Sequence, residues 1–142
     1  MNSPEQRPET VDRLANAVPA GLAMLAGMQL DLFTSLKDGP MAPEQIADAI
    51  GVGPTKLKPL LYALAAAGLL TTEGELFSNT PEASNFLVQG TPAYIGWRYR
   101  LFLSQWGGLL KTAESIRAGS PQAKNDFSAM SGQELETFAR RS

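Results

Sequence analysis

Few residues of this chain have the types and spacing that catalysis requires. The sequence contains no histidine and no cysteine, which removes the commonest general base, the commonest metal ligand and every thiolate site. Two carboxylates, Glu73 and Glu75, are near enough in sequence to form an acid–base pair, but they flank Gly74 in a predicted turn. We therefore interpret them as solvated hairpin charges, and the sequence predicts neither a catalytic residue nor a metal ligand.

Arginine alternates with aromatic residues in one segment, Trp97-Arg98-Tyr99-Arg100. Such a combination can stack on the bases of a single-stranded nucleic acid. Alternate residues of a helix face different sides, however, so the two arginines do not form one surface. We interpret this segment as a solvated helix face.

Composition favours one globular domain with a hydrophobic core. Of the 142 residues, 44% are hydrophobic and 18% are charged, and the net charge is −2. This balance provides no electrostatic attraction to nucleic acid or to an anionic membrane, so neither is predicted as a partner. Residues 1–10 lack the apolar core of a signal peptide, which predicts a cytoplasmic location. The apolar run at residues 20–30 is short for a membrane span, and we interpret it as a buried helix.

The apolar run belongs to the elements that could join two chains. A first helix is predicted from Thr10 with an interruption near Pro19, followed by a second helix from Ala20 to Leu36. The second helix has apolar residues on both sides, which leaves one face for another chain, and the long helix after Pro92 adds further apolar surface. The sequence therefore predicts a homodimer. The predicted interface residues are Leu22, Leu25, Met28, Phe33 and Phe102.

The middle of the chain has the pattern of a winged helix-turn-helix. A short helix is predicted over residues 43–49, and a second helix begins at Pro54 and ends at Gly68. Two short strands, 69–72 and 76–78, then form a small β-hairpin. Helix starts follow at Thr80-Pro81 and Thr91-Pro92, and the second is expected to open a long amphipathic helix bent at Gly107-Gly108 and ending at Gly119. The predicted fold class is mainly α.

These elements, in this order, resemble the N-terminal domain of caffeate-type and hydroxyindole-type O-methyltransferases and their bacterial relatives. The resemblance is carried by residues 28–33 (MQLDLF), 43–47 (PEQIA) with 50–52 (IGV), 60–64 (LLYAL) with 68–70 (GLL), 79–81 (NTP) and 106–119. It implies a flexible N-terminus at residues 1–9 and a winged-helix dimerisation domain at 10–119. Residues 120–142 would then be a linker and the start of a helix that leads to an absent catalytic domain.

The resemblance also implies a function for the full-length enzyme. That enzyme would transfer a methyl group from S-adenosylmethionine to a hydroxyl of an aromatic or polyketide-like small molecule, with this domain as a lid on the acceptor pocket. The family's histidine base and glycine-rich cofactor loop have no counterpart here, so we expect no catalysis and no cofactor binding by this chain alone. A separate catalytic domain is a further partner that the resemblance implies. The acceptor contacts carried over from the family are Leu103, Trp106, Phe127 and Met130.

Two alternatives remain open at the level of sequence. The first is a DNA-binding regulator, because winged helices read DNA. Against it, the outward side of the predicted helix after Pro54 offers no Arg, Asn or Gln to bases, and Glu73 and Glu75 would face phosphates. The second is a stand-alone module that binds an apolar ligand or partner through the aromatic helix.

Overall fold

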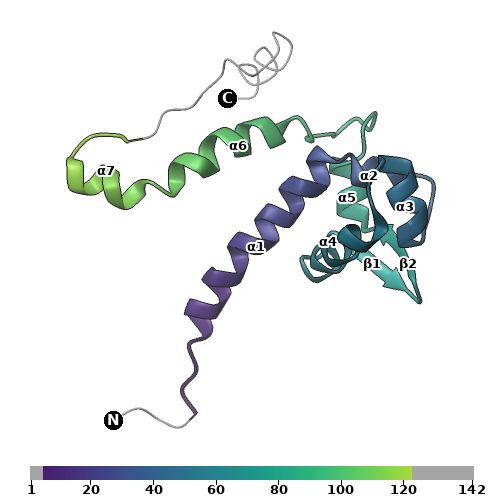
Figure 1. Cartoon of the computed structure of the whole chain (residues 1–142), viewed down its shortest axis with the longest axis horizontal. Coiled ribbons are helices and arrows are strands. Elements are labelled where there is room, and N and C mark those ends of the chain that lie inside the picture. The colour runs from purple at the N-terminus through teal and green to yellow at the C-terminus, as the bar shows by residue number, and fades with distance from the viewer. Residues whose placement is uncertain (1–4, 123–142) are drawn as a thin grey trace. The chain divides into compact units, whose positions relative to one another are not determined.

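The computed structural model describes residues 5–122. The chain divides into two units, and the boundary lies between Tyr94 and Ile95. This boundary falls inside the predicted domain 10–119. Unit 1 contains five helices, α1 (Glu9–Gln29), α2 (Leu32–Ser35), α3 (Pro43–Ile50), α4 (Pro54–Ala66) and α5 (Pro81–Phe86) (Figure 1). It also contains the strands β1 (Leu70–Glu73) and β2 (Leu76–Asn79). The described part of unit 2 contains α6 (Arg98–Leu109) and α7 (Thr112–Ala118). The mainly helical class with one two-stranded antiparallel hairpin in the described residues is confirmed.

Helix α1 is continuous through Pro19, where the sequence analysis expected an interruption. A proline inside a helix cannot donate to the carbonyl four residues earlier, here that of Ala15. Both residues are exposed, so water can bind the free carbonyl and the helix is not forced to end. The predicted helix Ala20–Leu36 is instead divided at Asp31, whose φ of 55° is left-handed and separates α1 from α2.

Helices α3 and α4 are separated by a short turn, Gly51–Gly53, and each begins with a proline at its first turn. The end of α4 is a Schellman motif, in which the Gly68 N–H donates to the Ala65 carbonyl at 3.1 Å and the Leu69 N–H donates to the Leu64 carbonyl at 3.0 Å. Gly68 has a φ of 90°, which is a conformation that side chains with a Cβ rarely adopt. This motif turns the chain directly into β1.

Strands β1 and β2 pair antiparallel in the register Thr72↔Phe77, around a turn in which Gly74 has a φ of 61°. The segment before α3 extends this hairpin, because the N–H and the carbonyl of Met41 each bond to Phe77 at 2.9 Å. The predicted hairpin at residues 69–78 is therefore confirmed to within one residue at each end.

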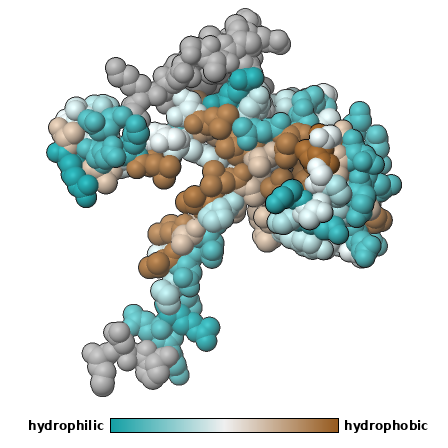
Figure 2. Space-filling view, in the orientation of Figure 1, coloured by the Kyte–Doolittle hydropathy of each residue, from teal (hydrophilic) through white to brown (hydrophobic). Residues whose placement is uncertain are grey.

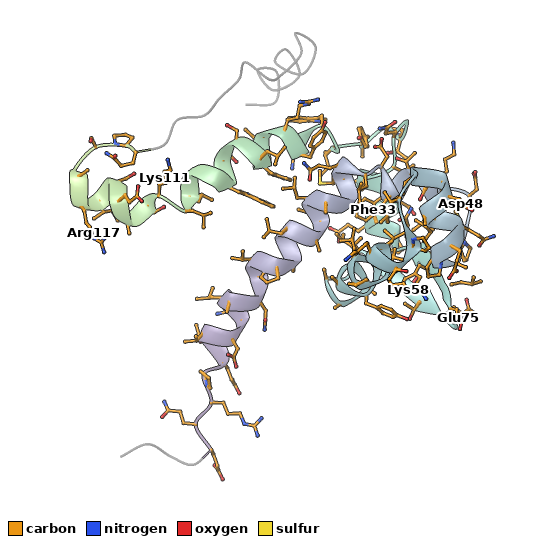
Figure 3. All side chains as sticks on the ribbon, in the orientation of Figure 1. Phe33, Asp48, Lys58, Glu75, Lys111 and Arg117 are labelled. Carbon is orange, nitrogen blue, oxygen red and sulfur yellow. The ribbon has the colours of Figure 1, made fainter. Side chains whose placement is uncertain are left out.

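The hydrophobic core of unit 1 lies where α1, α2, α3, α4 and the hairpin meet. Its largest fully buried side chains are Phe33, Phe77, Leu32, Ile46, Leu61 and Leu64. Figure 3 shows Phe33 inside this cluster, whereas Lys58 and Glu75 lie on its outside. The Asn79 side chain donates from Nδ2 to the Phe33 carbonyl at 2.9 Å, which ties the end of β2 to α2. Burying a side chain such as Phe33 stabilises a fold by about 1.5–3 kcal/mol.

Two predicted helix starts had different outcomes. Thr80 caps α5 as predicted, since its Oγ1 accepts a hydrogen bond from the Ala83 N–H at 3.3 Å. Thr91 caps no helix, and α6 begins only at Arg98. The Thr91 hydroxyl faces backwards instead, within donating distance of two preceding carbonyls, those of Asn85 at 2.9 Å and Val88 at 2.8 Å.

Unit 2 consists of α6 and α7 alone among the described residues. Helix α6 continues through Gly107 and Gly108, where a bend was expected, and ends at Leu109. The break falls at Leu110 and Lys111, and the Thr112 hydroxyl donates to the Leu109 carbonyl at 2.6 Å across it. Gly119 closes α7 with a φ of 71°. No residue of either helix is buried, so this pair has no core of its own.

Candidate dimerisation and acceptor surfaces

The outer half of α1 presents a row of apolar side chains that contact little of the described chain. Val11, Leu14, Val18 and Leu22, which we call the α1 stripe, are 49–65% exposed. Their spacing of three and four residues places them on one face of the helix. Figure 2 shows hydrophobic residues along one side of α1 and hydrophilic residues along the other. An exposed row of this kind is typical of a surface that another chain covers.

The predicted interface residues are divided by the structure. Leu22 is exposed and belongs to the α1 stripe, but Leu25, Met28 and Phe33 are only 6%, 7% and 1% exposed. These three side chains are core residues of a single chain, because the inner half of α1 packs against α4 and α2. Almost no surface of these three side chains is accessible to a second chain. The candidate interface therefore lies on the α1 stripe, nearer the N-terminus of the helix. Phe102 is half-buried in α6.

The predicted acceptor residues are only partly described. Trp106 stacks on Phe102, with ring centroids 5.0 Å apart and an interplanar angle of 7°. Leu103 is exposed on the same helix. A flat aromatic pair beside an aliphatic side chain is chemically suited to an aromatic ring. Phe127 and Met130 lie outside the described residues.

A polar anchor that the sequence analysis missed fixes the segment after α5. The Gln89 backbone N–H donates to the Thr34 Oγ1 at 3.1 Å, and the Gln89 Nε2 donates to the Asp31 Oδ1 at 2.8 Å. Both partners lie at the corner between α1 and α2. No sequence signal identifies this anchor, because its partners are 55 and 58 residues away along the chain.

The charge of the chain is unevenly distributed. Residues 1–94 contain ten acidic and five basic side chains, a net charge of −5. Residues 95–122 contain four basic side chains and one acidic side chain, a net charge of +3. Figure 3 labels two of the basic ones, Lys111 just before α7 and Arg117 within it. The net charge of −2 for the whole chain is therefore the sum of an acidic unit 1 and a basic segment that contains α6 and α7.

The face of α4 that a DNA-binding protein would use is exposed and makes only peripheral contacts within unit 1. Lys58 Nζ lies 4.0 Å from Glu44 Oε1 on α3, and the Tyr62 ring packs edge-on against Phe77 with centroids 5.4 Å apart. Glu73 and Glu75 are exposed at the hairpin turn, as predicted.

The glycines between α3 and α4 do not have the setting of a cofactor loop. A cofactor loop of the expected kind follows a strand and opens a helix, whereas Gly51 and Gly53 join helix α3 to helix α4. Within the same range, no group of three or more His, Cys, Asp or Glu residues could hold a metal ion. None of the described helices is both long enough and apolar enough to cross a membrane.

Comparison with known families identifies unit 1. The O-methyltransferase dimerisation domain matches residues 8–89, from the start of α1 to the Gln89 anchor. The chain belongs to this family. The match covers the α1 stripe and the core of unit 1 and ends before α6.

Two bacterial methyltransferases are similar to this dimerisation domain in sequence. The N,N-dimethyltransferase OxyT of Streptomyces rimosus is 30% identical over 122 residues, which are 83% of this chain and 36% of OxyT. The tetracenomycin polyketide synthesis 8-O-methyl transferase TcmO of Streptomyces glaucescens is 32% identical over 120 residues, 81% of this chain and 34% of TcmO. The chain thus spans about a third of the length of these relatives.

Solved structures agree with the fold. Human N-acetylserotonin methyltransferase in complex with SAM matches 100% of this chain and 43% of its own, with a TM-score of 0.71 and 21% identity. At this identity the match supports the fold alone.

Proposed function

We propose that this chain is the homodimerisation part of an S-adenosylmethionine-dependent methyltransferase and that the α1 stripe lies in the interface. The family match, which begins at residue 8 and so includes the whole exposed half of α1, is the observation that supports this best. Exposure of Val11, Leu14, Val18 and Leu22 to water is unfavourable. In a family of dimerisation domains, a second copy is the chain expected to cover them.

The stripe accounts for only part of such an interface. Its side chains are already about half covered, so burying the rest contributes about 1 kcal/mol each, or roughly 8 kcal/mol for the two copies together. Association costs roughly 4–15 kcal/mol in lost freedom of the two chains. A stable dimer therefore needs further apolar surface beside the α1 stripe.

Light scattering on the purified 142-residue chain tests the homodimer. We expect a dimer at micromolar concentration. Val18→Glu, which places a charge in the middle of the stripe, should raise the dissociation constant at least about tenfold because the carboxylate would be desolvated. Asn16→Glu is the matched control, since Asn16 is exposed on the opposite face of α1 and should change nothing. A monomeric parent chain, or equal effects of the two variants, would contradict the proposal.

We propose further that the full-length enzyme methylates an aromatic or polyketide-like small molecule. The relatives OxyT and TcmO support a methyl transfer, and the second is assigned to polyketide synthesis. One is an N,N-dimethyltransferase and the other an 8-O-methyl transferase, so a similar N-terminal part accompanies both nitrogen and oxygen acceptors. Our preference for a hydroxyl acceptor rests on the O-methyltransferase family match. The cofactor would be bound by a catalytic domain outside this chain.

In this enzyme the chain would also close the acceptor pocket, with Leu103, Trp106, Phe127 and Met130 as contacts. The stacked Phe102–Trp106 pair supports this assignment, because it presents a rigid aromatic surface. We interpret α3, α4 and the hairpin as a winged helix that provides packing rather than DNA recognition.

The lid assignment is tested in a full-length enzyme containing this chain. Trp106→Ala should raise the KM for the acceptor and leave the affinity for S-adenosylmethionine nearly unchanged. Gln105→Ala is the control, since Gln105 is an exposed neighbour on the same helix. Loss of folding or of dimerisation in Trp106→Ala would show that Trp106 is structural, and the lid assignment would then fail.

A further inference from the structure

We infer that Gln89 is a positioning residue for the acceptor side of the enzyme. Together with Asp31 and Thr34 it forms the Gln89 anchor, which holds the chain at the corner between α1 and α2, just before the connection to α6 begins. The inference rests on the proposed role of Leu103 and Trp106 as acceptor contacts on α6.

The corner that receives Gln89 is firmly placed in unit 1. Asp31 turns the chain from α1 into α2 with a φ of 55°, a left-handed conformation that Asp and Asn adopt more readily than other residues with a Cβ. The next two residues, Leu32 and Phe33, are 0% and 1% exposed, so they fix this corner to the core. The anchor therefore has a rigid base.

The side chain of Asp31 is used for the anchor and not for its own helix. Asp31 occupies the N-cap position of α2, where an aspartate commonly accepts a hydrogen bond from the first turn. Its side chain makes no capping hydrogen bond, and its Oδ1 instead accepts from Gln89 Nε2 at 2.8 Å. The Thr34 hydroxyl accepts from the Gln89 backbone N–H at 3.1 Å, so both the side chain and the backbone of Gln89 are held.

Gln89 is the point at which the chain leaves the packed part of unit 1. Leu87 and Val88 before it are buried, whereas Gly90, Pro92 and Ala93 after it are exposed. The backbone then continues in local turns, with the Thr91 N–H donating to the Val88 carbonyl at 3.4 Å and the Tyr94 N–H to the Thr91 carbonyl at 3.1 Å. Because these turns start beside Gln89, the direction of the outgoing chain depends on how Gln89 is held.

The connection from the anchor to α6 is short. It runs from Gly90 to Trp97, and α6 begins at Arg98. A short connection folded into turns restricts the positions that α6 can adopt, so release of Gln89 enlarges that range. In an enzyme, a displacement of about 1 Å far from the reacting atoms can cost about a hundredfold in rate. The anchor therefore contributes to the placement of Leu103 and Trp106.

A positioning role and a purely structural role predict different results. Asp31 and Gln89 are exposed, so water can replace their hydrogen bond without opening the core. Loss of the anchor should therefore alter the segment after α5 and the binding of the acceptor while leaving global stability nearly unchanged. A structural residue would lower global stability instead.

The first experiment reverses the polarity of the Asp31–Gln89 hydrogen bond in the 142-residue chain. Gln89→Glu places a second carboxylate against Asp31, and the repulsion should raise the hydrogen-exchange rate of the 87–94 segment about fivefold. Adding Asp31→Asn should restore the parent rate, because the new amide can donate to the new carboxylate and Asn tolerates the left-handed conformation. Gln29→Glu is the matched control, since it adds the same charge at the exposed end of α1.

The backbone half of the anchor provides an independent pair of variants. Thr34→Val has nearly the same shape but removes the acceptor of the Gln89 N–H, so exchange of the 87–94 segment should rise. Thr34→Ser keeps a hydroxyl and should behave like the parent chain. Urea unfolding checks that global stability is unchanged in all variants, and light scattering checks that their association state is unchanged.

The second experiment uses a full-length enzyme that contains this chain. Gln89→Glu should raise the KM for the acceptor about fivefold and leave the KM for S-adenosylmethionine unchanged, and Asp31→Asn in the same enzyme should restore the acceptor KM. Gln29→Glu should leave both values unchanged.

Three results would overturn the inference. The first is unchanged exchange in both Gln89→Glu and Thr34→Val. The second is a loss of stability in Gln89→Glu that Asp31→Asn does not restore. The third is an acceptor KM that stays at the parent value although exchange rises. Trp106→Ala then separates the inference from the proposed lid function: a raised acceptor KM in Trp106→Ala means that only the inference fails, and an unchanged one means that the lid assignment fails as well.

Discussion

Replacing Gly27 by alanine tests how tightly the inner half of α1 is packed. A Cβ at this position would lie 2.8 Å from Phe33 Cε2, 2.9 Å from Phe33 Cζ and 3.4 Å from Leu64 Cδ1. Phe33 and Leu64 are 1% and 0% exposed, so neither can turn into solvent to make room. Overpacking of a core costs about 1–3 kcal/mol. Alanine recovers about 1 kcal/mol through its higher helix propensity. Gly27→Ala should therefore lower the free energy of unfolding by about 1 kcal/mol.

Urea unfolding followed by circular dichroism measures this change. All samples are compared at one protein concentration, because a dimer makes the apparent stability depend on concentration. Gly107→Ala is the matched control within α6, since a Cβ there has no neighbour within 4 Å. It should leave the helix content unchanged or raise it. In a Phe33→Leu background the penalty of Gly27→Ala should shrink, because the ring atoms that meet the new Cβ are gone. A Gly27→Ala chain as stable as the parent would refute the reasoning.

Three further predictions concern single contacts and the cofactor. Thr80→Ala should cost about 1 kcal/mol in urea unfolding because α5 loses its cap, while Thr80→Ser should not; equal costs would contradict the capping role. Lys58→Ala should change stability by less than about 0.5 kcal/mol, because the 4.0 Å ion pair with Glu44 is exposed; a larger, salt-dependent loss would show that the pair is stronger than its geometry implies. Calorimetry should detect no saturable binding of S-adenosylmethionine to the 142-residue chain, and a one-site isotherm would mean that a cofactor site has been overlooked.

Local signals predicted the elements whose ends depend on neighbouring residues. Pro54 at the start of α4, Gly68 at its end and Gly74 in the hairpin turn each act through their own backbone preferences, and all three positions were predicted correctly. The errors arose where contacts with distant residues or with solvent determine whether a helix continues or begins. Exposure of the backbone lets α1 continue through Pro19, and the Thr91 hydroxyl bonds back to α5 and the residues after it.

The apolar face of α1 was predicted from the sequence, but its division into a buried part and an exposed part was not. Leu22 and Leu25 have the same chemistry and lie on the same side of α1, yet one is 49% exposed and the other 6%. Helical periodicity identifies an apolar face but not where along the helix that face stops being covered. The answer depends on α2 and α4, which pack against α1, whose buried residues all lie between Ala23 and Met28. An apolar face of α1 could therefore be predicted from sequence, whereas the part of that face that is buried within one chain could not.

The division of α1 into a buried inner half and an exposed outer half links the stability of this helix to dimer formation. The inner half is fixed by the Phe33 core, so the outer half begins from a helix that is already nucleated, which removes the costly first turn. The outer half still lacks tertiary contacts of its own and contains Pro19, which removes one backbone hydrogen bond. A partner surface on the α1 stripe would supply the missing stabilisation. In such a chain, dissociation of the proposed dimer and fraying of the outer half of α1 should occur together. A charge at Val18 acts on both, whereas a charge at Asn16 acts on neither.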